Sequence, residues 1–226
     1  MIDTRNPTRT SPAKVLIVDD HPSVREGLST RISGQADLEV CGEVSDGPEA
    51  LEFVATTVPD VAIVDISLKT GSGIDLIKQL KEFNSNIHVL VWSMHVDSLY
   101  AERALRAGAE GYINKEQATE HVIEAIRQIL SGKIYLSEPM ADQLLRRSIG
   151  GARQALGTTP VERLSDRELE TYRLIGEGLS TKEVAQRMAT HLRTVETYLA
   201  RTKKKFNFES RQQLVHAAAQ WVLENR

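Results

Sequence analysis

The segment Lys14-Val-Leu-Ile-Val-Asp-Asp20 contains four consecutive apolar residues that end in two carboxylates. Such an uninterrupted apolar run predicts a strand buried on both faces, because a strand with one face in water would alternate between apolar and polar residues. A pattern with helical spacing follows over residues 22–32. A doubly buried strand followed by a helix is the repeating unit of a parallel sheet that helices cover on both sides.

The same alternation continues through the first half of the chain. Further strands are expected at residues 38–44, 61–64, 87–92 and 111–113, and further helices at residues 48–56, 74–83, 97–107 and 117–130. Five strands that alternate with five helices predict an α/β fold with a five-stranded, parallel, doubly wound sheet. In such sheets ligands bind beyond the carboxyl ends of the strands.

Polar residues stand at those carboxyl ends. Asp19 and Asp20 follow the first predicted strand, and Asp65 follows the third. Ser93 and Lys115 follow the fourth and the fifth. A parallel sheet brings all five residues to one edge. A single aspartate after a strand is more often a turn residue or a helix cap than a ligand, but five such positions together are much less readily explained by chance.

Carboxylates that share one edge of a sheet repel one another. At ~4 Å and an effective dielectric constant of ~20, each pair costs ~4 kcal/mol. A divalent cation removes that repulsion, and hard oxygen ligands favour Mg²⁺ over softer metals. Lys115 adds a second positive charge. The set suits phosphoryl transfer, in which catalysis is largely positioning and charge neutralisation and an aspartate can itself accept the phosphoryl group.

The composition is typical of a folded protein in a reducing compartment. Of the 226 residues, 41 % are apolar and 26 % are charged, and the single cysteine, Cys41, cannot form an internal disulfide. No apolar stretch approaches the ~18 residues of a membrane-spanning helix, and the first fourteen residues lack the apolar core of a secretion signal. We therefore expect a cytoplasmic protein with no membrane partner. The six histidines are scattered, without the spacing of metal ligands.

The net charge of -3 conceals two halves of opposite sign. Residues 160–226 contain 12 of the 28 Lys and Arg and 9 of the 31 Asp and Glu, a net charge of +3, which leaves -6 for residues 1–159. The near-neutral total alone would argue against a nucleic-acid-binding protein. The asymmetry instead indicates different partners for the two halves.

A linker is expected between the halves, over residues 134–160. It includes one more candidate helix near residues 138–147 and a stretch rich in Gly, Ser, Thr and Pro over residues 148–160. Beyond it the pattern is wholly helical. Ser165 to Glu168 and Ser180 to Glu183 each have the capping-box spacing that starts a helix.

Two further helices are expected over residues 192–206 and 210–223, with Asn207 in the left-handed position that ends the first of them. Four short helices in fewer than 70 residues suggest a helix-turn-helix, in which the second helix of the pair enters the major groove of DNA. Four apolar residues at helical spacing are expected to face the core of this domain: Leu192, Val195, Leu199 and Phe206.

The opposite face of the residue 192–206 helix is therefore predicted to meet DNA. Thr197 and Arg201 could contact base edges, and Glu196 could accept a hydrogen bond from cytosine or remain a surface carboxylate. Phosphate contacts are expected from four basic residues: Arg193, Lys203, Lys204 and Lys205. The three lysines alone would equally fit a solvated basic helix end, which the helix dipole favours.

Four segments of the first half resemble the receiver domain of bacterial two-component response regulators. They are VLIVDDHPSVREGL (15–28), VAIVDISLKTGSGIDL (61–76), VLVWSMH (89–95) and GAEGYINK (108–115). The resemblance covers about residues 13–133 and implies a flavodoxin-like fold. It departs from the family pattern at Leu68 and Lys69, where Met-Pro is common, and the lost proline makes this loop less rigid.

The receiver resemblance implies a role for each residue at the strand ends. Asp65 would be the phosphoacceptor, and Asp19, Asp20 and Asp65 would hold Mg²⁺ together with the backbone carbonyl of Ser67. Ser93 would be the switch hydroxyl that bonds the phosphoryl group, and Lys115 its charge partner. Tyr112 would be the aromatic switch residue, although an ordinary strand aromatic explains it equally well.

The segment LSDRELETYRLIGEGLSTKEVAQRMATHLRTVETYLARTKKKFNFESR (164–211) resembles the LuxR-type helix-turn-helix of the NarL/FixJ response regulators. The match spans about residues 161–226 and includes Thr194-Val195-Glu196, which places Thr194 among the predicted DNA contacts. Tyr198 stands where a histidine is common, and Phe206-Asn207 replaces Leu-Gly.

Together the two resemblances imply a transcription regulator, not an enzyme, that a sensor histidine kinase phosphorylates. Its expected partners are that kinase and double-stranded promoter DNA, bound as a homodimer after phosphorylation, and RNA polymerase is a further candidate. Two alternatives remain. A phosphatase with an aspartyl nucleophile would need a second acid two residues after Asp65, where Ser67 stands. A constitutive DNA-binding protein, dimeric without phosphate, is compatible with the change at Leu68 and Lys69.

Overall fold

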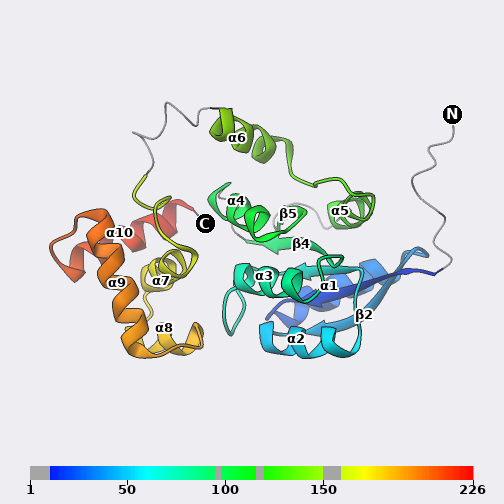
Figure 1. The fold of residues 1–226 in the computed structure, drawn as a ribbon, viewed down its shortest axis with the longest axis horizontal. Helices are drawn as coiled ribbons and strands as arrows, with labels where there is room; N and C mark the ends of the chain where they lie inside the picture. Colours follow the sequence, from blue (N-terminus) through cyan, green and yellow to red (C-terminus); the bar gives the residue numbers. More distant parts are fainter. Residues whose placement is uncertain (1–10, 95–97, 116–119, 150–158, 226) are drawn as a thin grey trace. The chain divides into compact units, whose positions relative to one another are not determined.

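The computed structural model describes residues 11–94, 98–115, 120–149 and 159–225 (Figure 1). They form two compact units: the described residues of Met1–Met94 and Ala104–Ser137 make up the first, and those of His95–Arg103 and Glu138–Arg226 the second. Parts of three predictions lie outside the described residues: the helix starts at residues 97 and 117 and the linker over residues 150–158.

The first unit contains the predicted sheet. Its strands are β1 (Ala13–Val18), β2 (Leu38–Val44), β3 (Val61–Val64), β4 (His88–Ser93) and β5 (Gly111–Asn114). They lie in the order β2-β1-β3-β4-β5, and every neighbouring pair is parallel. The prediction of a five-stranded, parallel, doubly wound sheet is confirmed.

Helices accompany the strands in alternation. They are α1 (Pro22–Ser33), α2 (Gly47–Thr56), α3 (Gly73–Phe83), α4 (Ser98–Ala107) and α5 (Glu120–Leu130). The apolar runs of β1 and β3 are buried on both faces. On one face, alternate strand residues pack with α1 and α5 in a single core cluster that includes Ile17, Ile63 and Ile126. Because all five strands are parallel, their carboxyl ends meet at one edge of the sheet.

The free edge of β5 carries a short additional pairing that the sequence analysis did not predict. Tyr135 forms a parallel bridge with Gly111. The Tyr112 N–H donates to the Tyr135 carbonyl at 2.9 Å, and the Tyr135 N–H donates to the Glu110 carbonyl at 2.9 Å. These bonds satisfy backbone groups of an edge strand that would otherwise be open to another chain.

The second unit is helical, with α6 (Glu138–Ile149), α7 (Asp166–Gly176), α8 (Thr181–Arg187), α9 (Leu192–Phe206) and α10 (Arg211–Glu224). Both predicted capping boxes are present, at Ser165 and Ser180, and Ser210 forms a third with Gln213. Asn207 has φ 56° and ψ 37°, the predicted left-handed end of α9. The helical domain that the sequence predicts is confirmed.

The set of α9 residues that face the core of the domain differs at one position from the prediction. Val195 and Leu199 are buried, and the half-buried Phe206 ring lies with its centroid 5.0 Å from that of Tyr172. Leu192, however, is 47 % exposed, so its assignment to the core is wrong. It is the first residue of α9 and lies before the turn that packs inward.

No helix in the described ranges combines the length and the apolar character that crossing a membrane requires.

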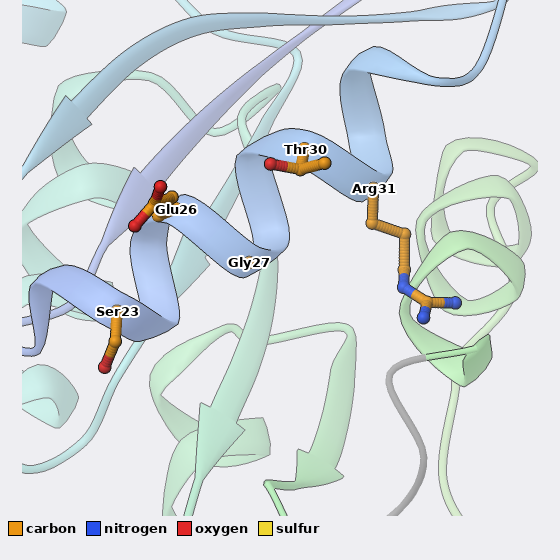
Figure 2. A pocket seen from close by; sticks show the side chains of 5 residues that line it. All are labelled: Ser23, Glu26, Gly27, Thr30 and Arg31. Carbon is orange, nitrogen blue, oxygen red and sulfur yellow. The ribbon is translucent and has the colours of Figure 1, made fainter.

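Two glycines in the first unit have contrasting surroundings. A Cβ at Gly73, the first residue of α3, would lie 2.1 Å from the Asp65 carbonyl oxygen and 2.6 Å from the Ile66 Cα. A Cβ at Gly27, on the outer side of α1, would meet nothing within 4 Å. Figure 2 shows Gly27 in a shallow hollow that Ser23, Glu26, Thr30 and Arg31 also line. Gly73 therefore permits the backbone after Asp65 to lie directly against α3.

Gly73→Ala and Gly27→Ala should shift stability in opposite directions. The first forces the backbone after Asp65 away from α3 and should lower the free energy of unfolding by about 3 kcal/mol. The second removes a glycine from a helix interior and should raise that free energy by up to about 1 kcal/mol. Denaturant unfolding of the full chain measures both. Equal effects of the two substitutions would contradict the close approach at Gly73.

Candidate functional site

The backbone itself aligns the strand ends that carry the polar residues. The Asp65 N–H donates to the Val18 carbonyl at 2.9 Å, and the Lys115 N–H donates to the Ser93 carbonyl at 2.7 Å. Each bond continues the sheet one residue beyond its strand. The first residue after β3 and the first after β5 therefore have fixed positions at the same edge.

Lys115 links the two most buried carboxylates of this edge. Its Nζ lies 2.6 Å from Asp19 Oδ2 and 2.7 Å from Asp65 Oδ2. Asp19 is 1 % exposed and Asp65 is 2 % exposed. Asp65 Oδ1 accepts a hydrogen bond from the Ser67 N–H at 3.1 Å. The structure thus brings together Asp19, Asp65 and Lys115, and it orients the Asp65 carboxylate from both of its oxygens.

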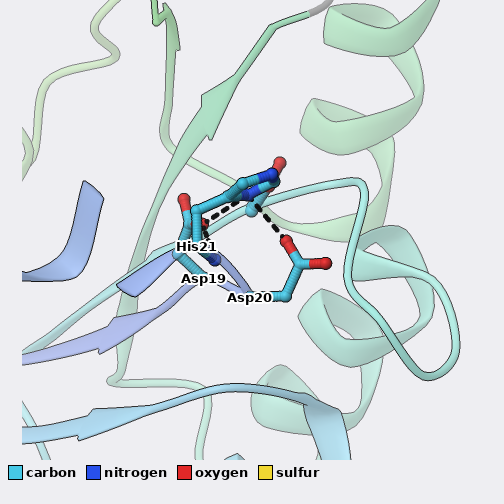
Figure 3. A group of neighbouring side chains, drawn as sticks. Asp19, Asp20 and His21 are labelled. Carbon is cyan, nitrogen blue, oxygen red and sulfur yellow. Dashed lines mark hydrogen bonds and ion pairs between the residues drawn. The ribbon is translucent and has the colours of Figure 1, made fainter. Parts of the chain in front are cut away.

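His21 also belongs to this cluster, and the sequence analysis missed it (Figure 3). Its Nδ1 lies 2.8 Å from Asp20 Oδ1 and 3.2 Å from Asp19 Oδ1. Its backbone N–H donates to Asp19 Oδ1 at 2.9 Å, which places the residue over the carboxylates at the start of α1. The available signal was its position directly after two aspartates; a search for metal-ligand spacing among the histidines could not find it.

Burial and like charge make the ionised Asp65 costly. Burial raises the pKa of the Asp65 carboxyl, Lys115 opposes this increase, and Asp19 adds to it. Burial lowers the pKa of Lys115, but the attraction of Asp65 and Asp19 outweighs it and leaves that pKa above its ordinary value. Lys115 therefore stays protonated at neutral pH, and the site favours a further positive charge near the carboxylates.

The donor set fits a divalent cation. Asp19, Asp20, His21 and Asp65 each offer a ligand atom, and these atoms all lie within 4.8 Å of one another. Three of the four are carboxylates, the hard oxygen ligands that Mg²⁺ prefers. The resemblance to receiver domains implies Mg²⁺, and this acidic cluster fits that expectation. The predicted contribution of the Ser67 carbonyl stays a prediction.

Two further predicted residues are buried beside the site. Ser93 ends β4 and is fully buried, and Tyr112 of β5 is buried as well. The Asn114 side chain donates to the Met94 carbonyl at 3.4 Å, which ties the loop after β4 to the end of β5. The positions of Ser93 and Tyr112 are compatible with the predicted switch, and their roles stay predictions.

On the helical unit, the outer face of α9 is one shallow groove. It is lined by six residues of that helix: Arg193, Glu196, Thr197, Ala200, Arg201 and Lys204. The Thr197 hydroxyl donates to the Arg193 carbonyl at 2.9 Å, so it keeps its oxygen available as an acceptor. The structure thus gathers the groove-facing residues that helical spacing predicts, with three cations and one carboxylate among them. Thr194 lies beside them and is half-buried.

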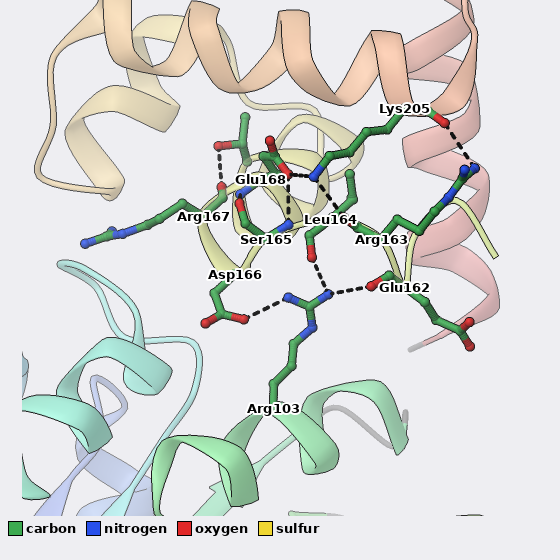
Figure 4. A network of polar contacts seen from close by, with 10 residues as sticks. Arg103, Glu162, Arg163, Leu164, Ser165, Asp166, Arg167, Glu168 and Lys205 are labelled. Carbon is green, nitrogen blue, oxygen red and sulfur yellow. Dashed lines mark hydrogen bonds and ion pairs between the residues drawn. The ribbon is translucent and has the colours of Figure 1, made fainter. Parts of the chain in front are cut away.

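Lys203 and Lys205 point back to their own domain (Figure 4 shows Lys205). Lys205 Nζ lies 2.5 Å from Glu168 Oε2 and donates to the Arg163 carbonyl at 2.8 Å. Lys203 Nζ donates to the Glu209 carbonyl at 3.4 Å. The Glu168 carboxylate also accepts a hydrogen bond from the Ser165 N–H in the capping box of α7. Burial raises the pKa of Glu168, but its hydrogen bonds from Lys205 and Ser165 leave that pKa below its ordinary value. Among the three lysines, Lys204 alone lines the groove.

Asp166, in the first turn of α7, is anchored within the same unit. The Arg103 guanidinium donates to its carboxylate at 2.8 Å and to the Leu164 carbonyl at 2.7 Å (Figure 4). These bonds satisfy a carboxylate and a carbonyl at the start of the helix.

Two family models match the chain. The response regulator receiver domain matches residues 15–127, and the luxR family of bacterial regulatory proteins matches residues 162–218. Among curated proteins, the oxygen regulatory protein NreC of Staphylococcus carnosus is 35 % identical over 91 % of this chain and 96 % of its own. The transcriptional activator protein ExaE of Pseudomonas putida is 33 % identical over 90 % of this chain and 94 % of its own.

Solved structures agree with these relatives. RcsB of Salmonella enterica serovar Typhimurium, bound to promoter DNA in the presence of the phosphomimetic BeF3⁻, has a TM-score of 0.67 and 25 % identity over 92 % of this chain and 98 % of its own. A LuxR-family two-component response regulator from Aurantimonas has a TM-score of 0.58 and 31 % identity over 62 % of this chain and 99 % of its own.

The fold defines the class of proteins in which a receiver-type α/β domain is joined to a LuxR-type helix-turn-helix domain. The chain belongs to the NarL/FixJ family of two-component response regulators. It is thus a DNA-binding response regulator and not a classical enzyme, which removes the phosphatase alternative.

Lys115→Met should destabilise the metal-free protein by about 3 kcal/mol, since it leaves two buried carboxylates without their shared cation. Mg²⁺ should restore part of the loss, because a bound cation neutralises the same carboxylates. Thermal unfolding with EDTA and with MgCl₂ measures both effects. Lys69→Met, at an exposed position of the loop after β3, is the matched control and should leave the unfolding temperature unchanged. A similar loss in both variants would contradict the central role of Lys115.

Proposed function

We propose that this response regulator accepts a phosphoryl group on Asp65 from a sensor histidine kinase and then binds promoter DNA through α9. The proposal rests on the convergence of Asp19, Asp65 and Lys115 at the carboxyl edge of the sheet. In terms of domains, residues 13–133 receive the phosphoryl group, residues 134–160 link, and residues 161–226 bind DNA. Function in the cytoplasm follows from the kinase and DNA partners.

The chemistry at Asp65 is a direct transfer. An Asp65 carboxylate oxygen attacks phosphorus, its bond to phosphorus forms as the bond from phosphorus to the kinase histidine nitrogen breaks, and a proton returns to that nitrogen. Asp19, Asp20, Asp65 and the Ser67 carbonyl would hold Mg²⁺, which would supply charge neutralisation to the transferring group. Lys115 remains protonated throughout and balances the charge that arrives on Asp65.

The phosphoryl group then acts as a local charge switch. An ester phosphate carries about -1.5 to -2 charges at neutral pH and several strong acceptor oxygens. Ser93 donates its hydroxyl to one of them, and Lys115 pairs with another. Ser93 ends β4, and Lys115 follows β5, the strand that contains Tyr112, so the change at Asp65 biases this end of the sheet between two arrangements.

Asp65→Asn should abolish phosphoryl uptake from a small acyl-phosphate donor such as acetyl phosphate, because the amide is no nucleophile. Phosphate-affinity electrophoresis or intact-protein mass spectrometry measures the modification. Asp60→Asn is the matched control: the Asp60 carboxylate accepts a hydrogen bond from the Lys14 N–H and lies at the opposite edge of the sheet. Unchanged labelling of the Asp65 variant would overturn the assignment.

DNA binding is proposed for the groove of α9. Arg193, Arg201 and Lys204 meet phosphates or guanine edges, while Thr194, Glu196 and Thr197 stand among the candidate base and backbone contacts. RcsB, the relative bound to promoter DNA, supports this assignment by its fold and its helix-turn-helix. A homodimer would read two half-sites about one helical turn apart.

Lys204→Ala and Lys205→Ala should separate DNA contact from folding. Lys204→Ala should weaken DNA binding and reduce the slope of log affinity against log salt by about 0.9, the value for one phosphate contact. Lys205→Ala removes the cation that pairs with the buried Glu168 carboxylate and should lower the unfolding temperature while the salt slope stays unchanged. Fluorescence anisotropy with duplex DNA at several salt concentrations provides the slopes. A reduced slope for Lys205→Ala alone would contradict the structure.

A constitutive DNA-binding protein is the second candidate, and it rests on Leu68 and Lys69. Leu68 is fully buried and replaces the usual methionine by a residue of similar volume, while Lys69 is exposed. Neither departure replaces a carboxylate of the site. Sedimentation with and without beryllofluoride and Mg²⁺ distinguishes the two: phosphorylation control requires dimer formation with the phosphoryl mimic, and constitutive control requires the dimer in both samples. An RNA polymerase contact is a further proposal for the DNA-bound form.

A further inference from the structure

His21 is the one titratable side chain of the carboxylate cluster, within the described residues, that neither the transfer chemistry nor the switch employs. Its Nδ1 lies within hydrogen-bond distance of a carboxylate oxygen from Asp19 and of one from Asp20. Its side chain is 61 % exposed, whereas the side chains of Asp19 and Asp20 are buried or nearly so. The imidazole therefore lies on the solvent side of the cluster, and it contacts Asp19 Oδ1 whereas the Lys115 ammonium contacts Asp19 Oδ2.

We propose that His21 is a nitrogen ligand of the metal ion at this site and that it shifts the preference of the site from Mg²⁺ toward first-row transition cations such as Mn²⁺. This inference rests on the proposed function, because it concerns the same cation that the phosphoacceptor site holds.

The geometry supports one ion shared by all four side chains. Opposite ligands of a cation with bonds of about 2.1 Å lie about 4.2 Å apart. The four candidate donor atoms already lie within 4.8 Å of one another, so a small rotation of the exposed imidazole brings Nδ1 into reach. Coordination requires the neutral imidazole tautomer that has its proton on Nε2 and its Nδ1 lone pair toward the ion.

The backbone restricts where this imidazole can go. The His21 N–H donates to Asp19 Oδ1 at 2.9 Å, and the Arg25 guanidinium donates to the Asp19 carbonyl at 2.5 Å. Pro22 at the first position of α1 fixes the chain immediately afterwards. The His21 Cα therefore stays beside the cluster whichever way its side chain turns.

Nitrogen ligation changes selectivity because cations differ in their preferred ligands. Mg²⁺ favours carboxylate, carbonyl and water oxygens, whereas affinity for nitrogen donors rises along the series from Mn²⁺ to Cu²⁺. An imidazole among three carboxylates should strengthen the binding of Mn²⁺ and leave the binding of Mg²⁺ nearly unaltered.

The test uses the full chain loaded with MnCl₂ and pulsed electron paramagnetic resonance. The wild-type spectrum should show the nitrogen modulation of a coordinated imidazole, and His21→Ala should lack it. Mn²⁺ affinity, measured by titration of the free-ion signal, should fall at least about tenfold, the loss that even outer-sphere partners produce. Mg²⁺ affinity, measured by competition, should change by less than about threefold.

Two further variants make the outcomes unambiguous. His216→Ala, at an exposed histidine of α10, should keep the nitrogen modulation. His21→Asn retains a polar residue before Pro22 and should lose the modulation as His21→Ala does. Absent modulation in the wild type, modulation that survives both His21 substitutions, or a rise in Mg²⁺ affinity on losing the imidazole would each overturn the inference; the last would identify His21 as a competing counter-ion.

Failure of the proposed function has a different signature. If Mn²⁺ binds with nitrogen modulation but Asp65 takes up no phosphoryl group, the phosphoacceptor assignment fails and the ligand assignment of His21 stands. If Asp65 is phosphorylated but the wild-type modulation is absent, the ligand assignment of His21 fails and the phosphoacceptor assignment stands.

Discussion

The structure of the first domain depends on one constraint: two carboxylates, Asp19 and Asp65, are buried side by side and share the Lys115 ammonium. Burial and the neighbouring Asp19 charge both raise the pKa of Asp65, whereas Lys115 and the Ser67 N–H oppose that increase. Such an arrangement needs fixed positions for three separate strand ends, which the parallel sheet supplies through backbone bonds one residue past β3 and β5. The fold therefore fixes the positions of these side chains, and the carboxylates outnumber the single ammonium. A cation binds favourably at such a site, and the cation in turn favours a phosphoryl group.

Features coded by local sequence were predictable. The runs Val15–Val18 and Val61–Val64 are typical of doubly buried strands. Together with the helical patterns between them, they predicted the parallel sheet and its carboxyl edge, where Asp19, Asp65 and Lys115 lie. Capping boxes depend on two residues three apart, and those at Ser165 and Ser180 are formed as expected. Asn207 adopts the left-handed conformation that its position at the end of a helix demands.

Features that depend on contacts between distant segments were not predictable. Lys205 looks like its neighbours Lys203 and Lys204, but Glu168, distant in sequence, captures it. Leu192 fits the helical period of the core, but it is the first residue of α9 and is 47 % exposed. No metal-ligand spacing marked His21, and its Nδ1 distances to Asp19 and Asp20 place it in the site. The periodicity of apolar residues predicts which face of a helix or strand is buried, but it does not predict which distant residues contact that face.

The ion pair between Lys205 and Glu168 reduces the positive charge that the second domain can present to DNA. The net charge of +3 over residues 160–226 overstates what faces DNA, since Lys203 and Lys205 are engaged internally and the groove offers three cations against the carboxylate of Glu196. Three phosphate contacts give a salt slope of only about -2.7, which is small for specific binding. A single copy should therefore hold DNA weakly, and two copies on adjacent half-sites double the contacts without any change in the helix. In the proposed mechanism, control of dimer formation by the Asp65 site would thereby become control of DNA occupancy.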